Sequence, residues 1–170
     1  MDLEYTVTET VHRNRAGQII RIDYQFEETI TVETKSTLSS NTLRHQNKEK
    51  RSRTYDATVT REQYGGLTAQ LRNPLTFDAF ITVLRPFIMG YYTSDELERA
   101  FSALDRDHSG TIHVNELNVF LPILNDTVDS DALSDYIRKV DDNFDGIMNY
   151  DEFRSLVLRG IGRDIICNHL

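Results

Sequence analysis

The 170-residue chain contains one cysteine, no tryptophan and only three prolines. The single cysteine, Cys167, cannot form an internal disulfide, which excludes small disulfide-stabilised folds and agrees with a reducing compartment. No apolar run approaches the roughly 18 to 20 residues that cross a bilayer, so the sequence predicts no transmembrane segment. The first residues, Met1 to Glu4, lack the basic and apolar regions of a signal peptide. We therefore expect a cytoplasmic protein.

The sequence also lacks the motifs of common enzyme classes. No serine or cysteine lies in a nucleophile motif, and no glycine-rich loop is suited to binding phosphate. The net charge of −8 and the pI of 5.1 argue against nucleic acid as the main partner, because phosphate binding needs a cationic surface. Hydrophobic residues at 39% and charged residues at 27% are typical of globular proteins. We therefore expect a folded protein that is not an enzyme and does not bind nucleic acid.

Acidic residues are concentrated in the C-terminal part of the chain. Residues 1–60 contain nine acidic and nine basic side chains, so the whole negative excess lies in residues 61–170. Between Thr93 and Phe153 there are fifteen acidic residues and four basic ones. Such dense like charges destabilise a compact state unless a cation compensates them. This region is either a solvated acidic surface or a metal-binding region.

The N-terminal part alternates between apolar and polar residues with the period of a β-strand. Two such runs lie between Leu3 and about Val32, on either side of a turn signal at residues 14–17. We expect residues 1–35 to form a β-hairpin-like segment that docks on something else, since a lone hairpin is marginally stable in water. Residues 36–57 are polar and basic, which favours an exposed linker.

After Thr93 the apolar residues recur with the period of a helix. Four short apolar stripes lie within residues 93–162, and a capping box of Thr93 and Glu96 begins the first. The stripes are paired around two acidic loops, residues 105–116 and 141–152. Residues 163–170 remain as a C-terminal tail.

Both loops have twelve residues, with oxygen-bearing side chains at alternating positions and a glycine at position 6. A calcium ion takes about 6 to 8 oxygen ligands, so one loop must wrap around it and supply oxygens from alternate residues. The candidate ligands are Asp105, Asp107, Ser109, the Thr111 carbonyl and Glu116 in the first loop, and Asp141, Asn143, Asp145, the Ile147 carbonyl and Glu152 in the second. The alternative is that both turns only cap helices. Agreement over twelve residues that occurs twice favours the metal site.

On these motifs, the region from Phe80 to the C-terminus resembles the second half of a calmodulin- or troponin C-type protein. The resemblance covers about half of the chain and implies a helical lobe of paired EF-hands. It implies two bound Ca²⁺ ions, for which Mg²⁺ is expected to compete. Ile112 and Met148 lie between the ligand positions, where the two loops can form a short β-bridge.

Residues 68–79 align with the two loops but lack their ligands. Asn73 stands at the glycine position and tolerates a positive φ, and Leu75 aligns with Ile112 and Met148. Thr68, Gln70 and Arg72 supply no carboxylate. We interpret residues 58–92 as a degenerate EF-hand with a connecting helix. The alternative is an ordinary amphipathic helix preceded by a loop.

The expected fold class is mainly α, with a paired EF-hand lobe (93–162) preceded by a degenerate EF-hand-like segment and a β-rich N-terminal segment. The expected function is calcium-dependent regulation of a protein partner that inserts an amphipathic helix into a groove between the lobe helices. A calcium buffer and a regulatory subunit or fragment of a larger enzyme are the alternatives. The expected groove residues are Phe101, Leu117, Phe120, Leu121, Ile137, Phe153, Leu156 and Val157.

Overall fold

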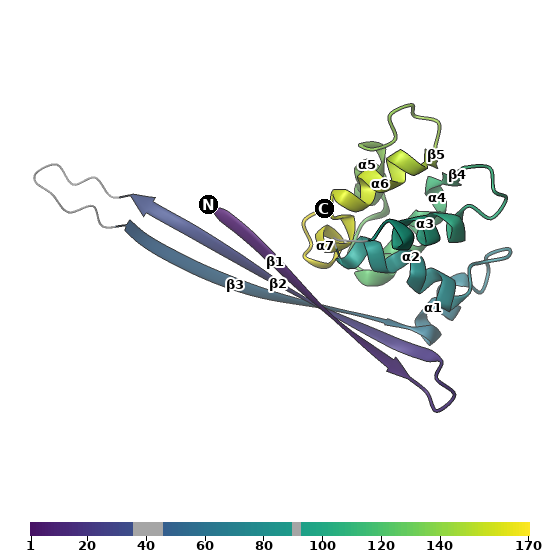
Figure 1. Cartoon of the computed structure of the whole chain (residues 1–170), viewed down its shortest axis with the longest axis horizontal. Helices are drawn as coiled ribbons and strands as arrows, with labels where there is room; N and C mark the ends of the chain where they lie inside the picture. The colour runs from purple at the N-terminus through teal and green to yellow at the C-terminus, as the bar shows by residue number, and fades with distance from the viewer. Residues whose placement is uncertain (36–45, 90–92) are drawn as a thin grey trace, which may run out of the picture.

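The chain folds into a long three-stranded antiparallel sheet followed by a helical lobe (Figure 1). The structure is a computed structural model that describes residues 1–35, 46–89 and 93–170. The strands β1 (Asp2–Arg13), β2 (Ile19–Lys35) and β3 (Gln46–Thr60) contain 12, 17 and 15 residues. The expectation of a mainly α fold is therefore wrong, because a large sheet makes up the N-terminal part.

Residues 46–57 account for much of this difference, since their composition favours a linker and they form most of β3. The strand pairs with β2 from Arg21 opposite Thr60 to Lys35 opposite Gln46. Its basic side chains are exposed and partly paired within the sheet, with Lys48 Nζ 3.3 Å from Glu33 Oε1. Charged side chains are common on edge strands, where they discourage further pairing. The rest of the expected linker, residues 36–45, and the connecting residues 90–92 lie outside the described residues.

The turn between β1 and β2 lies at residues 14–17, at the turn signal in the sequence. The Asn14 side chain organises it, because its Oδ1 accepts the N–H groups of Ala16 and Gln18, each at 3.0 Å. Gly17 adopts a φ of +80°, which a residue with a Cβ rarely tolerates. The two strands then pair from Arg13 opposite Ile19 to Asp2 opposite Thr31.

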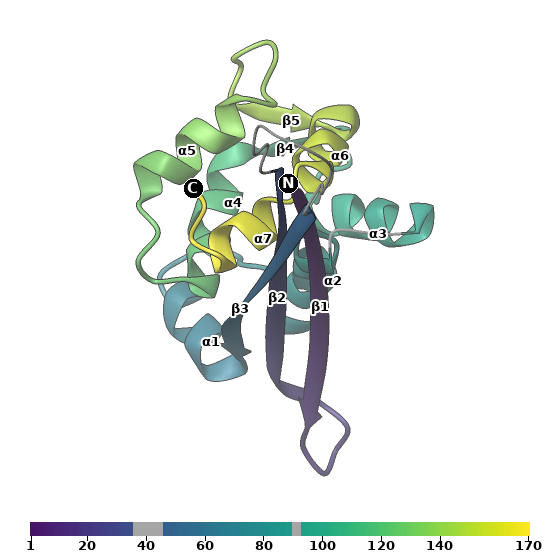
Figure 2. The same cartoon turned by 90° about the vertical axis from the view of Figure 1, so that its left-hand side faces the viewer.

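One face of the sheet packs on the lobe and shares its core. Ile22, Tyr24 and Phe26 of β2 and Ala57 and Val59 of β3 alternate along their strands and are buried. The other ends of β2 and β3 extend beyond the lobe in Figure 1, and the β1–β2 turn extends beyond it at the bottom of Figure 2. The docked half of the sheet therefore has the hydrophobic support that an isolated hairpin lacks.

The lobe contains seven α-helices, one 3₁₀ helix and a two-stranded sheet within the described ranges. None of these helices is long and apolar enough to cross a membrane. In chain order the elements are α1 (Arg61–Thr68), α2 (Phe77–Met89), α3 (Ser94–Leu104), β4 (Thr111–His113), α4 (Val114–Phe120), η1 (Leu121–Leu124), α5 (Ser130–Arg138), β5 (Ile147–Asn149), α6 (Tyr150–Leu158) and α7 (Ile161–Ile166).

Helix α7 spans the boundary between the predicted lobe, which ends at residue 162, and the predicted tail, residues 163–170. It packs against α2, and Gly162 lies so close to it that a Cβ would come 2.3 Å from the Phe87 carbonyl oxygen. Beyond α7, the His169 side chain is 3.2 Å from the buried Glu28 carboxylate of β2. Tyr5 and Tyr55 donate their hydroxyls to the same carboxylate at 3.2 and 3.3 Å. The C-terminal residues thus join the lobe to the sheet.

Helices α1 and α2 enclose a loop, residues 69–76, which we call the 69–76 loop. Asn73 adopts a φ of +58° at the position where the other two loops have glycine. The Tyr64 hydroxyl donates to the Leu75 carbonyl at 2.7 Å, and the Tyr64 ring stacks on Phe80 with centroids 4.6 Å apart. These contacts fix the loop against its own two helices.

Candidate metal centre

The two acidic loops have the same backbone conformation at two special positions. At position 4, His108 and Phe144 both have a φ of +55°. At position 6, Gly110 and Gly146 have φ values of +82° and +72°. Glycine adopts such values without strain, which explains its place in both loops. The loops therefore curl around their own interiors in the same way.

A short antiparallel ladder joins the loops. Ile112 of β4 pairs with Met148 of β5, and both side chains are buried, so the structure contains the bridge that the sequence suggests. The Val114 N–H also donates to the Gly146 carbonyl at 3.3 Å. A change in one loop can thus reach the other through hydrogen-bonded backbone.

In the first loop, the carboxylates accept hydrogen bonds from the loop itself. Asp105 Oδ1 accepts the Ser109 N–H at 3.0 Å, and Oδ2 accepts the Gly110 N–H at 2.8 Å. Asp107 Oδ1 also accepts the Ser109 N–H, at 3.1 Å. Hydrogen bonding by Ser109 keeps the pKa of Asp107 below its ordinary value. The loop therefore holds Asp107 as a carboxylate, the form that binds a cation.

The second loop repeats this pattern and leaves one acceptor unsatisfied. Asp141 Oδ2 accepts the Gly146 N–H at 3.2 Å, and Asp145 Oδ1 accepts the Ile147 N–H at 3.0 Å. Asn143 Oδ1 accepts the Asp145 N–H at 3.2 Å. The other oxygen of Asp141, Oδ1, is buried and has no hydrogen-bond partner in the part of the chain that the structure describes. Such a buried acceptor is costly unless a donor or a cation satisfies it.

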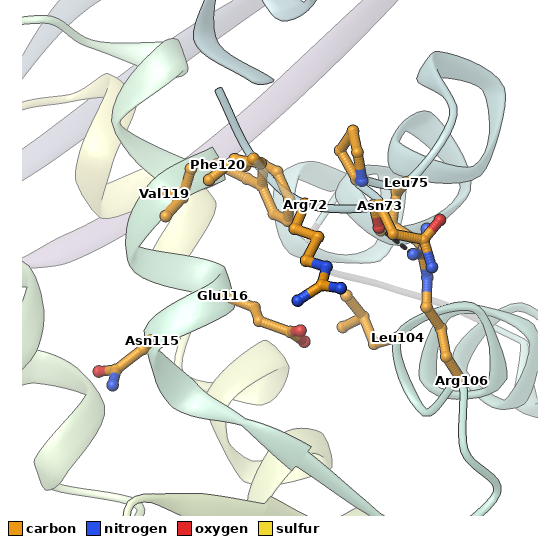
Figure 3. A pocket seen from close by; sticks show the side chains of 11 residues that line it. Arg72, Asn73, Leu75, Leu104, Arg106, Asn115, Glu116, Val119 and Phe120 are labelled. Carbon is orange, nitrogen blue, oxygen red and sulfur yellow. Dashed lines mark hydrogen bonds between the residues drawn. The ribbon is translucent and has the colours of Figure 1, made fainter. Parts of the chain in front are cut away.

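The final glutamates of the two loops differ. Glu152 is only 6% exposed, and its Oε1 and Oε2 accept the N–H groups of Asp142 at 3.3 Å and Asn149 at 2.9 Å. Asn149 in turn accepts the Glu152 N–H at 2.9 Å, which completes a capping box. His113 occupies the equivalent position in the first loop and makes no side-chain capping bond there. Glu116 is exposed and points into a neighbouring pocket (Figure 3).

The predicted ligands therefore line two curled loops without meeting at a point. In the described ranges, no group of three His, Cys, Asp or Glu side chains is positioned to hold a metal ion. The carboxylates contact their own backbone N–H groups instead. Carboxylate, amide, hydroxyl and carbonyl oxygens are nevertheless the ligands that calcium prefers. With the unsatisfied oxygen of Asp141, this donor set fits calcium.

The sequence did not predict the cationic surroundings of Glu116. A pocket of about 220 Å³ between the 69–76 loop and α4 is lined by Arg72, Arg106 and Glu116 among apolar side chains. The Arg106 guanidinium donates to the Asn73 carbonyl and so ties the first acidic loop to the 69–76 loop (Figure 3). The sequence does contain one indication of this cationic pocket. Arg72 aligns with Ser109 and Asp145, so a positive charge stands where the acidic loops have a ligand position.

Comparison with known proteins agrees with this geometry. Residues 94–158 match the family model of the EF-hand domain pair. The chain is 30% identical over 103 residues to a rice protein (Oryza sativa subsp. japonica) named probable calcium-binding protein CML7, covering 59% of this chain and 70% of that protein. It is 29% identical over 87 residues to the rice putative calmodulin-like protein 6, covering 49% of this chain and 51% of the relative.

A third relative is troponin C from Todarodes pacificus, which is 36% identical over 63 residues. That match covers 37% of this chain and 43% of the troponin C. The chain thus spans about half the length of two of these three relatives and a larger share of the third. It belongs to the EF-hand calmodulin/troponin C superfamily.

Proposed function

We propose that the chain binds one Ca²⁺ ion in each acidic loop and that calcium controls its contact with a protein partner. The observation that carries the proposal is the pair of loops with matching backbone, joined by β4 and β5, with a buried unsatisfied oxygen on Asp141. Bound calcium supplies a double positive charge that offsets the carboxylates. The proposed ligands are Asp105, Asp107, Ser109, the Thr111 carbonyl and Glu116, and Asp141, Asn143, Asp145, the Ile147 carbonyl and Glu152.

The last glutamate of each loop connects calcium binding to the movement of a helix. Glu116 and Glu152 each lie in the first turn of a helix, α4 and α6, that leaves a loop. Movement of either carboxylate onto a bound ion would apply force to that helix. Because Phe120 is on α4 and Phe153 is on α6, a helix shift would change the packing of the apolar residues behind the loops. The ladder between β4 and β5 would couple the two shifts.

The apolar residues of the expected groove are all buried beneath the chain's own helices. The Phe87 ring of α2 lies 5.4 Å from the Phe153 ring, and the Phe80 ring lies 5.3 Å from that of Phe120. A partner helix would therefore enter only if α2 moved away from α4 and α6. A calcium buffer that does not open is the second candidate function, and this burial is the observation that favours it.

Hydrogen exchange and dye binding with and without calcium distinguish the two functions. A regulator should bind a hydrophobic dye and an amphipathic model peptide only with calcium, and the amides of Leu121, Leu156 and Val157 should then change their protection. A buffer should bind calcium while these signals stay constant. The matched control is the Glu116→Gln and Glu152→Gln double variant, in which calcium should have no effect. Failure of the wild type to bind calcium would contradict both functions.

A further inference from the structure

We infer that the projecting part of the sheet binds the second acidic loop of another copy of this chain. We call this part the ribbon; it consists of residues 2–4 of β1, 29–34 of β2 and 47–53 of β3. The ribbon and the loop each expose apolar side chains beside a charged one, and the two charges are opposite. The inference concerns a surface and not the calcium sites, so it does not depend on the proposed function.

The lobe-side face of the ribbon carries apolar side chains that the lobe leaves uncovered. Side chains two residues apart along a strand point to the same side of a sheet, so the face that holds the buried Phe26 continues to Ile30 and Val32. Ile30 pairs with Leu3 of β1 and with Arg51 of β3. Leu3 is 44% exposed, and Ile30 and Val32 are only partly buried. The ends of β2 and β3 extend past the helices in Figure 1, so this apolar strip is open to a partner.

Arg53 supplies an unpaired positive charge on the same face. It lies opposite Glu28 in the register of β2 and β3. The Glu28 carboxylate is already bound by the side chains of Tyr5, Tyr55 and His169. Arg53 is exposed, and within the described ranges it forms no ion pair. A free guanidinium beside an apolar strip fits a partner that offers a carboxylate next to an apolar side chain.

The second acidic loop exposes this combination. Phe144, at position 4, is 79% exposed. Asp142, at position 2, is also exposed, and its carboxylate has no hydrogen bond or ion pair in the part of the chain that the structure describes. The first loop has Arg106 and His108 at these two positions, so it would repel Arg53 and lacks the apolar side chain. The second loop is therefore the one that fits the ribbon.

The two surfaces do not meet within one chain. In Figure 1 the second loop, between α5 and β5, lies at the top of the view, whereas the ribbon extends to the left. A second copy brings its own loop to the ribbon, and the reverse contact completes a symmetric dimer. In each contact the Phe144 ring covers the apolar strip, and Asp142 pairs with Arg53. Because both charges are exposed, the association should weaken as the salt concentration rises.

The experiment is sedimentation equilibrium of the whole chain at low salt, with a calcium chelator present. The wild type should associate reversibly from a 19.7-kDa monomer to a dimer. Phe144→Asn should weaken this association by about 10-fold, the loss expected for a buried aromatic anchor. Asparagine tolerates the φ of +55° at this position, so the loop keeps its shape. The matched control is His108→Asn at the same position of the first loop, which should leave the association unchanged.

An exchange of charges tests the pairing of Arg53 with Asp142. Arg53→Asp and Asp142→Arg should each weaken the association by about 3- to 10-fold, because each places like charges together. The two changes in one chain should restore most of it. An arginine fits position 2 of such a loop, since the first loop has Arg106 there. Circular dichroism should show the wild-type fold for each variant.

Three results would overturn the inference. The first is a chain that stays monomeric at all concentrations, which would leave the ribbon to a different partner. The second is an association that neither Phe144→Asn nor Arg53→Asp weakens, which would place the contact on another surface. The third is a double variant that associates no better than its two single variants. Because calcium is absent from the experiment, failure of either proposed calcium site would leave these results unaffected.

Discussion

Replacement of Gly162 by alanine should destabilise the protein, although the same replacement at Gly66 should stabilise it. Both glycines lie inside helices, α7 and α1. A methyl group on Gly66 would have no atom within 4 Å, whereas one on Gly162 would lie 2.3 Å from the Phe87 carbonyl oxygen and 2.6 Å from its carbon. Both substitutions therefore remove the same backbone freedom of a helical glycine, but only Gly162→Ala creates a steric clash.

The expected magnitudes follow from these contacts. Alanine is favoured over glycine inside a helix by about 0.5–1 kcal/mol, which applies at both positions. At Gly162 the new carbon must reach an ordinary separation of about 3.5 Å, so α7 has to move away from α2 by about 1 Å. Overpacking of this kind costs about 1–3 kcal/mol. We therefore expect Gly162→Ala to lower the free energy of unfolding by about 1–2 kcal/mol and Gly66→Ala to raise it by about 0.5–1 kcal/mol.

Urea unfolding monitored by circular dichroism measures both changes against the wild type. The calcium concentration must be held constant, because a bound ligand adds its own stabilisation. Since both variants carry the same substitution, a difference in sign cannot arise from helix propensity. A Gly162→Ala variant as stable as the wild type would refute the close approach of α7 to α2, and with it the packing of the C-terminal residues into the core.

The remaining predictions concern three side chains. Without calcium, Glu152→Ala should lower the free energy of unfolding by about 1 kcal/mol because it leaves the Asn149 N–H unpaired. Glu116→Ala should change the free energy of unfolding by less than about 0.5 kcal/mol. Equal losses in urea unfolding would contradict the contrast between the two glutamates. Burial raises the pKa of the Cys167 thiol to about 11, so the native thiol should react with a disulfide reagent at pH 8 far more slowly than in urea, and a rapid native reaction would contradict its burial. Because burial raises this pKa, the stability that the neutral Cys167 thiol contributes should be complete below the unfolded pKa of about 8.5 and should be lost as the pH rises toward 11. Urea unfolding of the wild type and Cys167→Ala at several pH values would measure this loss.

The two acidic loops could be predicted from the sequence because the residues that define them are adjacent in the chain. In each loop, twelve consecutive residues contain the proposed ligands, the glycine and the apolar residue of the bridge, so spacing alone locates Ile112 and Met148 opposite each other. The capping box of Thr93 and Glu96 is equally local and begins α3 in the structure. The assignment to the EF-hand superfamily required no more than this.

The features that were missed depend on contacts between distant segments. Strand β3 resembles a linker in composition, and only its pairing with β2 makes residues 46–57 a strand. The sequence predicts a tail at residues 163–170, but Ile161–Ile166 form α7, in which Gly162 permits a close approach to Phe87. Glu116 and Arg72 line the same pocket although they belong to different helix–loop–helix units. Local periodicity contains no information about such approaches.

The most direct test of the account is a calorimetric calcium titration of the full chain, with Glu116→Gln and Glu152→Gln as site-specific controls. We expect two ions per chain in the wild type, and each variant should strongly weaken the site whose bidentate carboxylate it removes. A count of zero would contradict the proposed function. A count of three would mean that residues 68–79 form a site as well, although they supply no carboxylate at the aligned ligand positions, and a single ion unaffected by either variant would place calcium outside the two loops.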